Sequence, residues 1–209
     1  MVFKDLQVNL LVQIKNLETR IMEHINALED PGEFGLNKPY SAKYWTAPPP
    51  GSMKLNIDAA IRHDLAAIAV VARDQKGIIT NAWAKEIELS DLVVAEAAAI
   101  NWALQLAANE EFANICVESD AKVCIDALAG SIDDCWWNIR AITARSLDLA
   151  VNFDSCNFLW AGRNANQVAH MLAKVTFSLD SPFSCTSHSL PPSVVVEAWN
   201  RDLLSFSSK

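Results

Sequence analysis

The sequence predicts a mixed α/β fold, in which helices cover both faces of a five-stranded sheet. Residues 54–58 alternate between apolar and polar side chains, as a strand with one buried face does. Residues 66–72 form a continuous apolar run, and the turn-forming residues 74–77 connect this run to a third extended segment. Helical and extended segments alternate further along the chain, so we expect the initial meander to continue into αβ units.

The expected elements follow one another in the order β-β-β-α-β-α-α-β-α. The strands are expected at residues 54–58, 66–72, 78–87, 114–119 and 153–160. The helices are expected at residues 92–108 and 121–129, from a cap at Asp133 or Asp134 to about Ala150, and at 167–177. Ser90 is a favourable N-cap for the first of these helices, and Gly130 is a typical residue to end the second.

The chain divides into three parts. Residues 1–44 are expected to hold an amphipathic helix and a linker, because apolar residues recur there at steps of three or four. We expect this helix to dock on the domain or to be a leftover linker, and a dimerising helix is the alternative. Residues 45–178 form the predicted compact domain. Residues 179–209 form a Ser/Pro-rich tail that is expected to be irregular, except for an apolar patch at 194–199 that packs back on the domain.

Composition and charge restrict the classes of function. The chain of 209 residues carries a formal net charge of −8, whereas proteins that hold nucleic acid mainly by phosphate contacts are usually basic. The five cysteines lack zinc-site spacing, so we expect reduced thiols of an intracellular protein. The sequence shows neither a secretory signal nor an apolar run that approaches the length of a membrane span. We therefore expect a cytoplasmic or nuclear protein without a membrane partner.

Three carboxylates stand out by their positions in the expected elements. Asp58 lies at the end of the first expected strand, Glu96 on the small-residue face of the first long helix, and Asp120 at the end of the fourth strand. Ligands of α/β sheets bind beyond the carboxyl ends of strands, and clustered carboxylates favour a hard cation such as Mg²⁺. The alternatives are that Glu96 reaches water at the edge of its face and that Asp120 caps the following helix.

Five segments carry a more specific pattern. Trp45–Asp58 contains a Trp, several prolines, a Gly and a Lys-x-Asn-x-Asp strand, and Val70–Gly77 ends in an Arg-Asp-x-x-Gly turn. Ala95–Leu104 is an Ala-Glu helix, and Val117–Ala121 contains Glu-Ser-Asp. Arg163–Lys174 reads Arg-x-x-Asn-x-x-Ala-His-x-Leu-Ala-Lys. In this order the segments resemble the plant ribonuclease H-like domain of retroelement origin (non-LTR reverse transcriptases), within the type 1 ribonuclease H superfamily.

The resemblance implies a ribonuclease H-like fold with five strands and a specific chemistry. That chemistry is endonucleolytic hydrolysis of the RNA strand of an RNA–DNA hybrid, with Mg²⁺ or Mn²⁺ as the cofactor. By the same resemblance, Asp58 would bridge two metal ions, and Glu96 and Asp120 would hold one of them. Arg163 and Asn166 would contact the nucleic acid.

The sequence departs from the family pattern at two places. His170 stands where the family's fourth catalytic acid is expected, although His is common there in the plant proteins. A neutral His offers one nitrogen and no charge, so the site of the second metal should be weakened and Mn²⁺ favoured. Ala59 and residues 66–67 replace expected glycines, which would keep the hybrid further from the backbone.

The alternative function is a catalytically weakened or inactive nucleic-acid-binding domain derived from a retroelement. A third hypothesis is a protein-interaction scaffold that uses the amino-terminal helix. Trp136 and Trp137 are candidates for stacking on nucleotides, although at least one of them is expected in the core.

Overall fold

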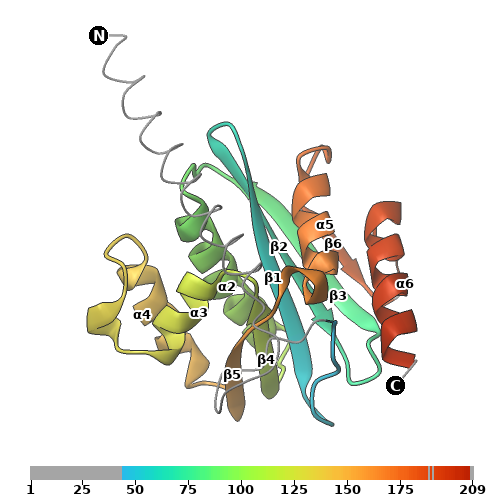
Figure 1. Ribbon diagram of the computed structural model, residues 1–209, viewed down its shortest axis with the longest axis horizontal. Coiled ribbons are helices and arrows are strands. Elements are labelled where there is room, and N and C mark those ends of the chain that lie inside the picture. The colour runs from blue at the N-terminus through green and yellow to red at the C-terminus, as the bar shows by residue number, and fades with distance from the viewer. Residues whose placement is uncertain (1–43, 188, 190, 208–209) are drawn as a thin grey trace, which may run out of the picture.

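The computed structural model describes residues 44–187, 189 and 191–207 of the chain. The amphipathic helix that the sequence predicts near the amino terminus lies outside the described residues. The described part folds around one mixed sheet with the strand order β5-β4-β1-β2-β3-β6 (Figure 1). The strands are β1 (Met53–Arg62), β2 (Leu65–Arg73), β3 (Ile79–Ile87), β4 (Asn114–Ser119), β5 (Ser155–Trp160) and β6 (Phe183–Thr186).

The sheet joins an antiparallel meander to a parallel part. β1, β2 and β3 pair as consecutive antiparallel neighbours, whereas β4 pairs in parallel with β1 and β5 pairs in parallel with β4. Parallel neighbours require a crossover, and helices provide it here. The helices are α2 (Leu92–Asn109), α3 (Lys122–Ala129), α4 (Arg140–Ala150), α5 (Gln167–Thr176) and α6 (Ser193–Ser207), with short 3₁₀ turns at Ile132–Asp134 and Arg163–Ala165.

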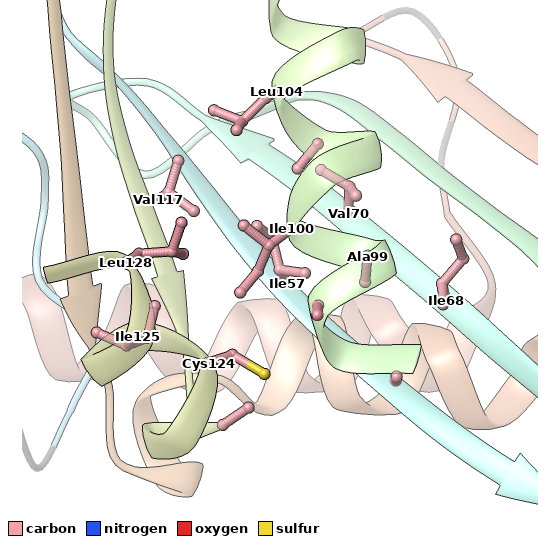
Figure 2. Close-up of a cluster of buried hydrophobic side chains, with 14 of the residues drawn as sticks. Ile57, Ile68, Val70, Ala99, Ile100, Leu104, Val117, Cys124, Ile125 and Leu128 are labelled. Carbon is pink, nitrogen blue, oxygen red and sulfur yellow. The ribbon is translucent and has the colours of Figure 1, made fainter. Parts of the chain in front are cut away.

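The helices cover both faces of the sheet, which confirms the predicted mixed α/β class. α2, α3 and α4 belong to one face, and α5 and α6 belong to the other (Figure 1). Figure 2 shows the larger of the two cores, in which α2 packs on the central strands and α3 closes one side. Its labelled members are Ile57, Ile68, Val70, Ala99, Ile100, Leu104, Val117, Cys124, Ile125 and Leu128.

Small residues allow α2 to approach the sheet closely, as the sequence predicted. Four alanines at every fourth position of this helix are fully buried, namely Ala95, Ala99, Ala103 and Ala107. By length and composition α2 is the one described helix that could cross a bilayer, which differs from the expectation that no run comes near that length. More than half of this stretch is buried inside the fold, as the central helix of a core is.

The carboxy-terminal region differs from the prediction. The segment expected as an irregular tail contributes β6, in which Cys185 pairs with Ala82 of β3, so the sheet has six strands rather than five. The apolar patch at 194–199 packs back as predicted, but it belongs to the longer helix α6, which buries Val195 and Ala198. The partner of β6 is a distant sheet edge, and local sequence signals do not report such a partner.

All five cysteines are free thiols, as expected. Burial raises the pKa of Cys116 and Cys185, and it raises the pKa of Cys156 to about 11. Thiols with raised pKa values carry little thiolate at neutral pH and are therefore poor nucleophiles.

Candidate metal centre

The site lies at a notch where β1 extends beyond its parallel neighbour. β4 ends at Ser119, which pairs with Ile57, whereas β1 continues to Arg62. Beyond this point, the backbone N–H of Ala59 donates to Oε1 of Glu96 at 3.2 Å instead of to a strand. The sequence predicted Asp58 at the end of its strand, but it lies in the middle of β1. It does lie where the parallel pairing with β4 ends.

The notch brings together the three carboxylates that the sequence singled out. One oxygen each from Asp58, Glu96 and Asp120 lie within 4.8 Å of one another. Asp58 is 2% exposed and Glu96 is 5% exposed, so both are largely removed from water. Three clustered carboxylate oxygens form a donor set that suits a hard divalent cation such as Mg²⁺ or Mn²⁺. The residues present therefore fit the metal that the fold family implies.

Electrostatics at the cluster support this fit. Burial raises the pKa of Asp58 well above its usual range, and the negative charges of Asp120 and Glu96 raise it further. The positive charge of Arg163 acts in the opposite direction but does not outweigh them. Like charges in a buried site disfavour ionisation, whereas a bound cation would reverse this preference.

α5 brings the fourth residue to the cluster. Nδ1 of His170 lies 3.0 Å from Oδ2 of Asp58, and the imidazole is mostly buried. The structure thus places His170 beside Asp58, at the position where the family resemblance expects a fourth acidic residue. The contact engages one oxygen of Asp58 with a nitrogen that contributes no negative charge.

Asp120 is held by partners from the segment that leads into α5. Nε of Arg163 donates to Oδ2 of Asp120 at 3.2 Å, and Nδ2 of Asn166 lies 3.4 Å from its Oδ1. The N-cap of α3 is Ala121, and it makes no side-chain capping bond, so the cap interpretation of Asp120 is wrong. The side chain of Arg163 is 54% exposed beside the cluster, and its predicted contact with nucleic acid remains a prediction.

Two further sequence expectations need correction. Asn166, expected to contact nucleic acid, is 0% exposed, and its amide donates inward to the carbonyl oxygen of Ile57 at 2.8 Å. Trp136 and Trp137 are 45% and 84% exposed, so neither belongs to the core that the helical spacing suggested for one of them.

Sequence reasoning expected His170 at the site but missed that Asn166, at the start of α5, contacts the cluster from the buried side. Asn166 and His170 are four residues apart, so they share one face of the helix, and each contacts one aspartate of the cluster. The spacing of these two residues was the available signal. It was overlooked because the resemblance had assigned Asn166 to the nucleic acid.

The strand order and the acidic notch define a ribonuclease H-like domain, and comparisons with known proteins agree with this class. Residues 56–176 match the family described as reverse transcriptase-like. Since the match covers more than half of the chain, the protein belongs to this family. A search of curated proteins finds no match.

Solved structures share the fold. Ribonuclease H1 of Halobacterium salinarum is 24% identical, with a TM-score of 0.56 over 61% of this chain and 98% of that one. The amino-terminal RNase H domain of a Mycobacterium tuberculosis protein is 18% identical, with a TM-score of 0.56 over 61% and 94%. LC11-RNase H1, solved in complex with an RNA/DNA hybrid, is 19% identical, with a TM-score of 0.54 over 60% and 96%. At these identities the likeness shows the fold alone.

Proposed function

We propose that this protein is a metal-dependent endoribonuclease that hydrolyses the RNA strand of RNA–DNA hybrids. The observation that carries the proposal is the cluster of Asp58, Glu96 and Asp120, in which one oxygen of each residue lies within 4.8 Å of the other two. Membership of the reverse transcriptase-like family and the likeness to ribonucleases H1 support it. A cytoplasmic or nuclear location remains a prediction from the sequence.

The three carboxylates would hold the cation, Mg²⁺ or Mn²⁺. When bound, the cation supplies Lewis acidity at the scissile phosphate and neutralises the charge that develops there. The chain's own residues supply the geometry. The backbone N–H of Ala59 on β1 holds Glu96 by a hydrogen bond to its Oε1. Nδ1 of His170 orients Asp58 by its contact with Oδ2 of the aspartate.

Arg163 would be the contact with the nucleic-acid backbone. Its guanidinium is half-exposed at the rim of the cluster, so it can reach a phosphate while Nε remains on Asp120. A guanidinium suits a phosphate group because it can donate two parallel hydrogen bonds. The net charge of −8 opposes a polyanion, so binding is expected to be weak and to decrease with salt only as far as its few phosphate contacts require.

A second function is favoured by one specific observation. His170 stands where the family pattern has an acidic residue, so the cluster has one negative charge fewer than that pattern. Its Nδ1 contacts one oxygen of Asp58 at 3.0 Å. A site with only three carboxylates would hold a second cation weakly. The alternative is therefore a domain of retroelement origin that binds nucleic acid but cleaves it slowly or not at all.

Cleavage of a labelled RNA–DNA hybrid tests the choice between these functions. Purified protein should cleave the RNA strand in Mn²⁺ and less efficiently in Mg²⁺, and Asp58→Asn should abolish cleavage because it removes a central ligand. Asp64→Asn is the matched control, since Asp64 is exposed in the turn after β1. A folded wild-type protein that cleaves in neither metal would exclude the enzyme and leave the binding domain.

A further inference from the structure

We infer that Asn166 is a positioning residue of the metal centre, which fixes Asp120 relative to the strand that carries Asp58. The inference rests on the proposed function, because it concerns the cation that the carboxylates would hold. Asn166 is 0% exposed, so from this position it touches neither solvent nor a nucleic acid. Any role it has at the site must therefore act through its neighbours.

The amide of Asn166 connects two elements of the notch. Nδ2 donates to the backbone oxygen of Ile57 at 2.8 Å and to Oδ1 of Asp120 at 3.4 Å. Both partners are acceptors, so the amide nitrogen must face them and the two hydrogens serve one partner each. Ile57 directly precedes Asp58 on β1, and Asp120 directly follows β4. The side chain thus sets the position of the second aspartate against the backbone beside the first.

The same side chain gives up two stabilising interactions. Asn166 is the N-cap residue of α5, yet it makes no side-chain capping bond, although such a bond typically contributes about 1 kcal/mol. Its Oδ1 is buried and accepts no hydrogen bond from the described residues, which also costs free energy. The stability of α5 therefore does not explain the placement of this side chain, whereas its two contacts at the notch do.

α5 extends this arrangement to the other aspartate. His170 lies one turn after Asn166 on the same helical face, and its Nδ1 contacts Asp58 at 3.0 Å. One rigid helix therefore contacts Asp58 and Asp120 from the same side. Loss of the Asn166 amide should leave Asp120 with the half-exposed Arg163 but without its buried link to β1. Asp58 keeps its contact with His170, so the spacing between the two carboxylates should be less tightly set.

Calorimetric titration with Mn²⁺ tests the inference on the full chain. Asn166→Ala should raise the Mn²⁺ dissociation constant roughly tenfold or more, as the loss of an outer partner of a metal ligand typically does. Asn164→Ala is the matched control, because Asn164 is the same residue type, two positions earlier and exposed. It should leave the constant unchanged. If Asn166→Ala fails to fold, Asn166→Ser should still bind Mn²⁺ more weakly than the control variant.

A double-mutant cycle separates positioning from general destabilisation. If Asn166 acts through Asp120, Asn166→Ala should change the Mn²⁺ dissociation constant of an Asp120→Asn protein by less than twofold. An equal loss in both backgrounds, or no loss in the wild type, overturns the inference.

Hybrid cleavage by the same preparations distinguishes this inference from the proposed function. A wild type that cleaves while Asn166→Ala binds Mn²⁺ as tightly overturns the inference alone. A wild type that binds Mn²⁺ and loses affinity on substitution, yet does not cleave, supports the inference and overturns the ribonuclease. A wild type that binds no Mn²⁺ overturns both.

Discussion

Two buried charged regions lie on the same face of β1, and their charges are compensated in different ways. In the first, Nζ of Lys54 forms an ion pair with Oε1 of Glu118, and Oε2 of Glu118 accepts from the amide of Asn56 at 3.1 Å. Oδ1 of Asn56 in turn accepts from Nε1 of Trp45 at 3.0 Å. The second begins at Asp58, the next residue on this face, and gathers three carboxylates.

The difference shows in which region the protein's own side chains balance the buried charges. The Lys54 region matches a buried cation to a buried anion, as does the nearby pair of Arg73 and Asp202 at 2.7 Å. The Asp58 region contains more negative than positive charge. Burial raises the pKa of Asp58, and the negative charges of Asp120 and Glu96 raise it further. Paired charges stabilise a fold only where both partners stay, whereas an excess of charge is suited to an external ion. The first region is therefore structural, and the second is the candidate site.

The largest effect is expected where a completed pair is broken. Lys54→Ala leaves the carboxylate of Glu118 buried without its cation, which should lower the free energy of unfolding by roughly 3–5 kcal/mol. Urea unfolding measures this change, and Mn²⁺ added to both proteins should not narrow the difference in unfolding free energy between the variant and the wild type. Lys122→Ala breaks an exposed pair with Asp126 and should cost less than about 0.5 kcal/mol. Similar losses in the two variants would contradict the structural role of the Lys54 region.

A smaller effect of opposite sign is expected at Asp58. Its folded-state pKa lies above the unfolded value, so its contribution to stability is present at low pH and is lost as the pH rises through the folded pKa. Asp58→Asn should therefore raise the melting temperature of the metal-free protein at pH 7. The gain should disappear below about pH 4, near the ordinary pKa of an aspartate. A variant less stable than wild type at pH 7 would show that the carboxylates do not repel one another.

Restoring the fourth carboxylate should bring the cluster nearer to the family pattern. His170→Asp adds two oxygens and a charge beside Asp58, so Mg²⁺ affinity should rise on the order of tenfold, the scale of single partners at metal sites. Activity in Mg²⁺ relative to Mn²⁺ should increase with it, since imidazole suits Mn²⁺ better than Mg²⁺. Parallel metal titrations of cleavage test this, and an unchanged ratio would count against a role for His170 in metal choice.

The smallest effect is expected at Arg163, which lies half-exposed at the rim of the carboxylate cluster. Arg163→Ala should reduce the slope of log affinity against log salt by about 1 for a catalytically inactive protein on an RNA–DNA hybrid, the change expected for one phosphate contact. Fluorescence anisotropy at several salt concentrations measures the slope. Arg140→Ala provides an exposed arginine on α4 for comparison. Equal slopes for wild type and Arg163→Ala would remove Arg163 from the binding surface.

Sequence reasoning located the three carboxylates because each sits at a position that strand and helix patterns fix. Asp58 lies on β1, Asp120 directly follows the neighbouring parallel strand β4, and Glu96 lies on the alanine face of α2. Local periodicity singled out these positions, and the family resemblance was needed to join them in one site. The strand-end rule placed Asp120 correctly, whereas Asp58 lies within β1, at the point where the parallel pairing with β4 stops.

Other features depend on contacts that no local pattern reports. β6 is a four-residue strand whose partner is the edge of β3, about one hundred residues earlier in the chain. Asn166 was assigned to the nucleic acid, but its buried side chain points to Ile57 and Asp120 across the fold. Trp136 and Trp137 follow a helical apolar spacing, but the helix begins only at Arg140, so the spacing did not apply to them.

Urea unfolding with and without Mn²⁺ tests most directly the claim that the three carboxylates of the Asp58 region bind a divalent cation. At a free Mn²⁺ concentration 100-fold above its dissociation constant, the wild type should gain about 2.7 kcal/mol of unfolding free energy. Asp58→Asn should gain much less, and Asp64→Asn should gain as much as the wild type. Equal stability of the wild type with and without Mn²⁺ would mean that the three carboxylates hold no metal, and the account of this region would be wrong.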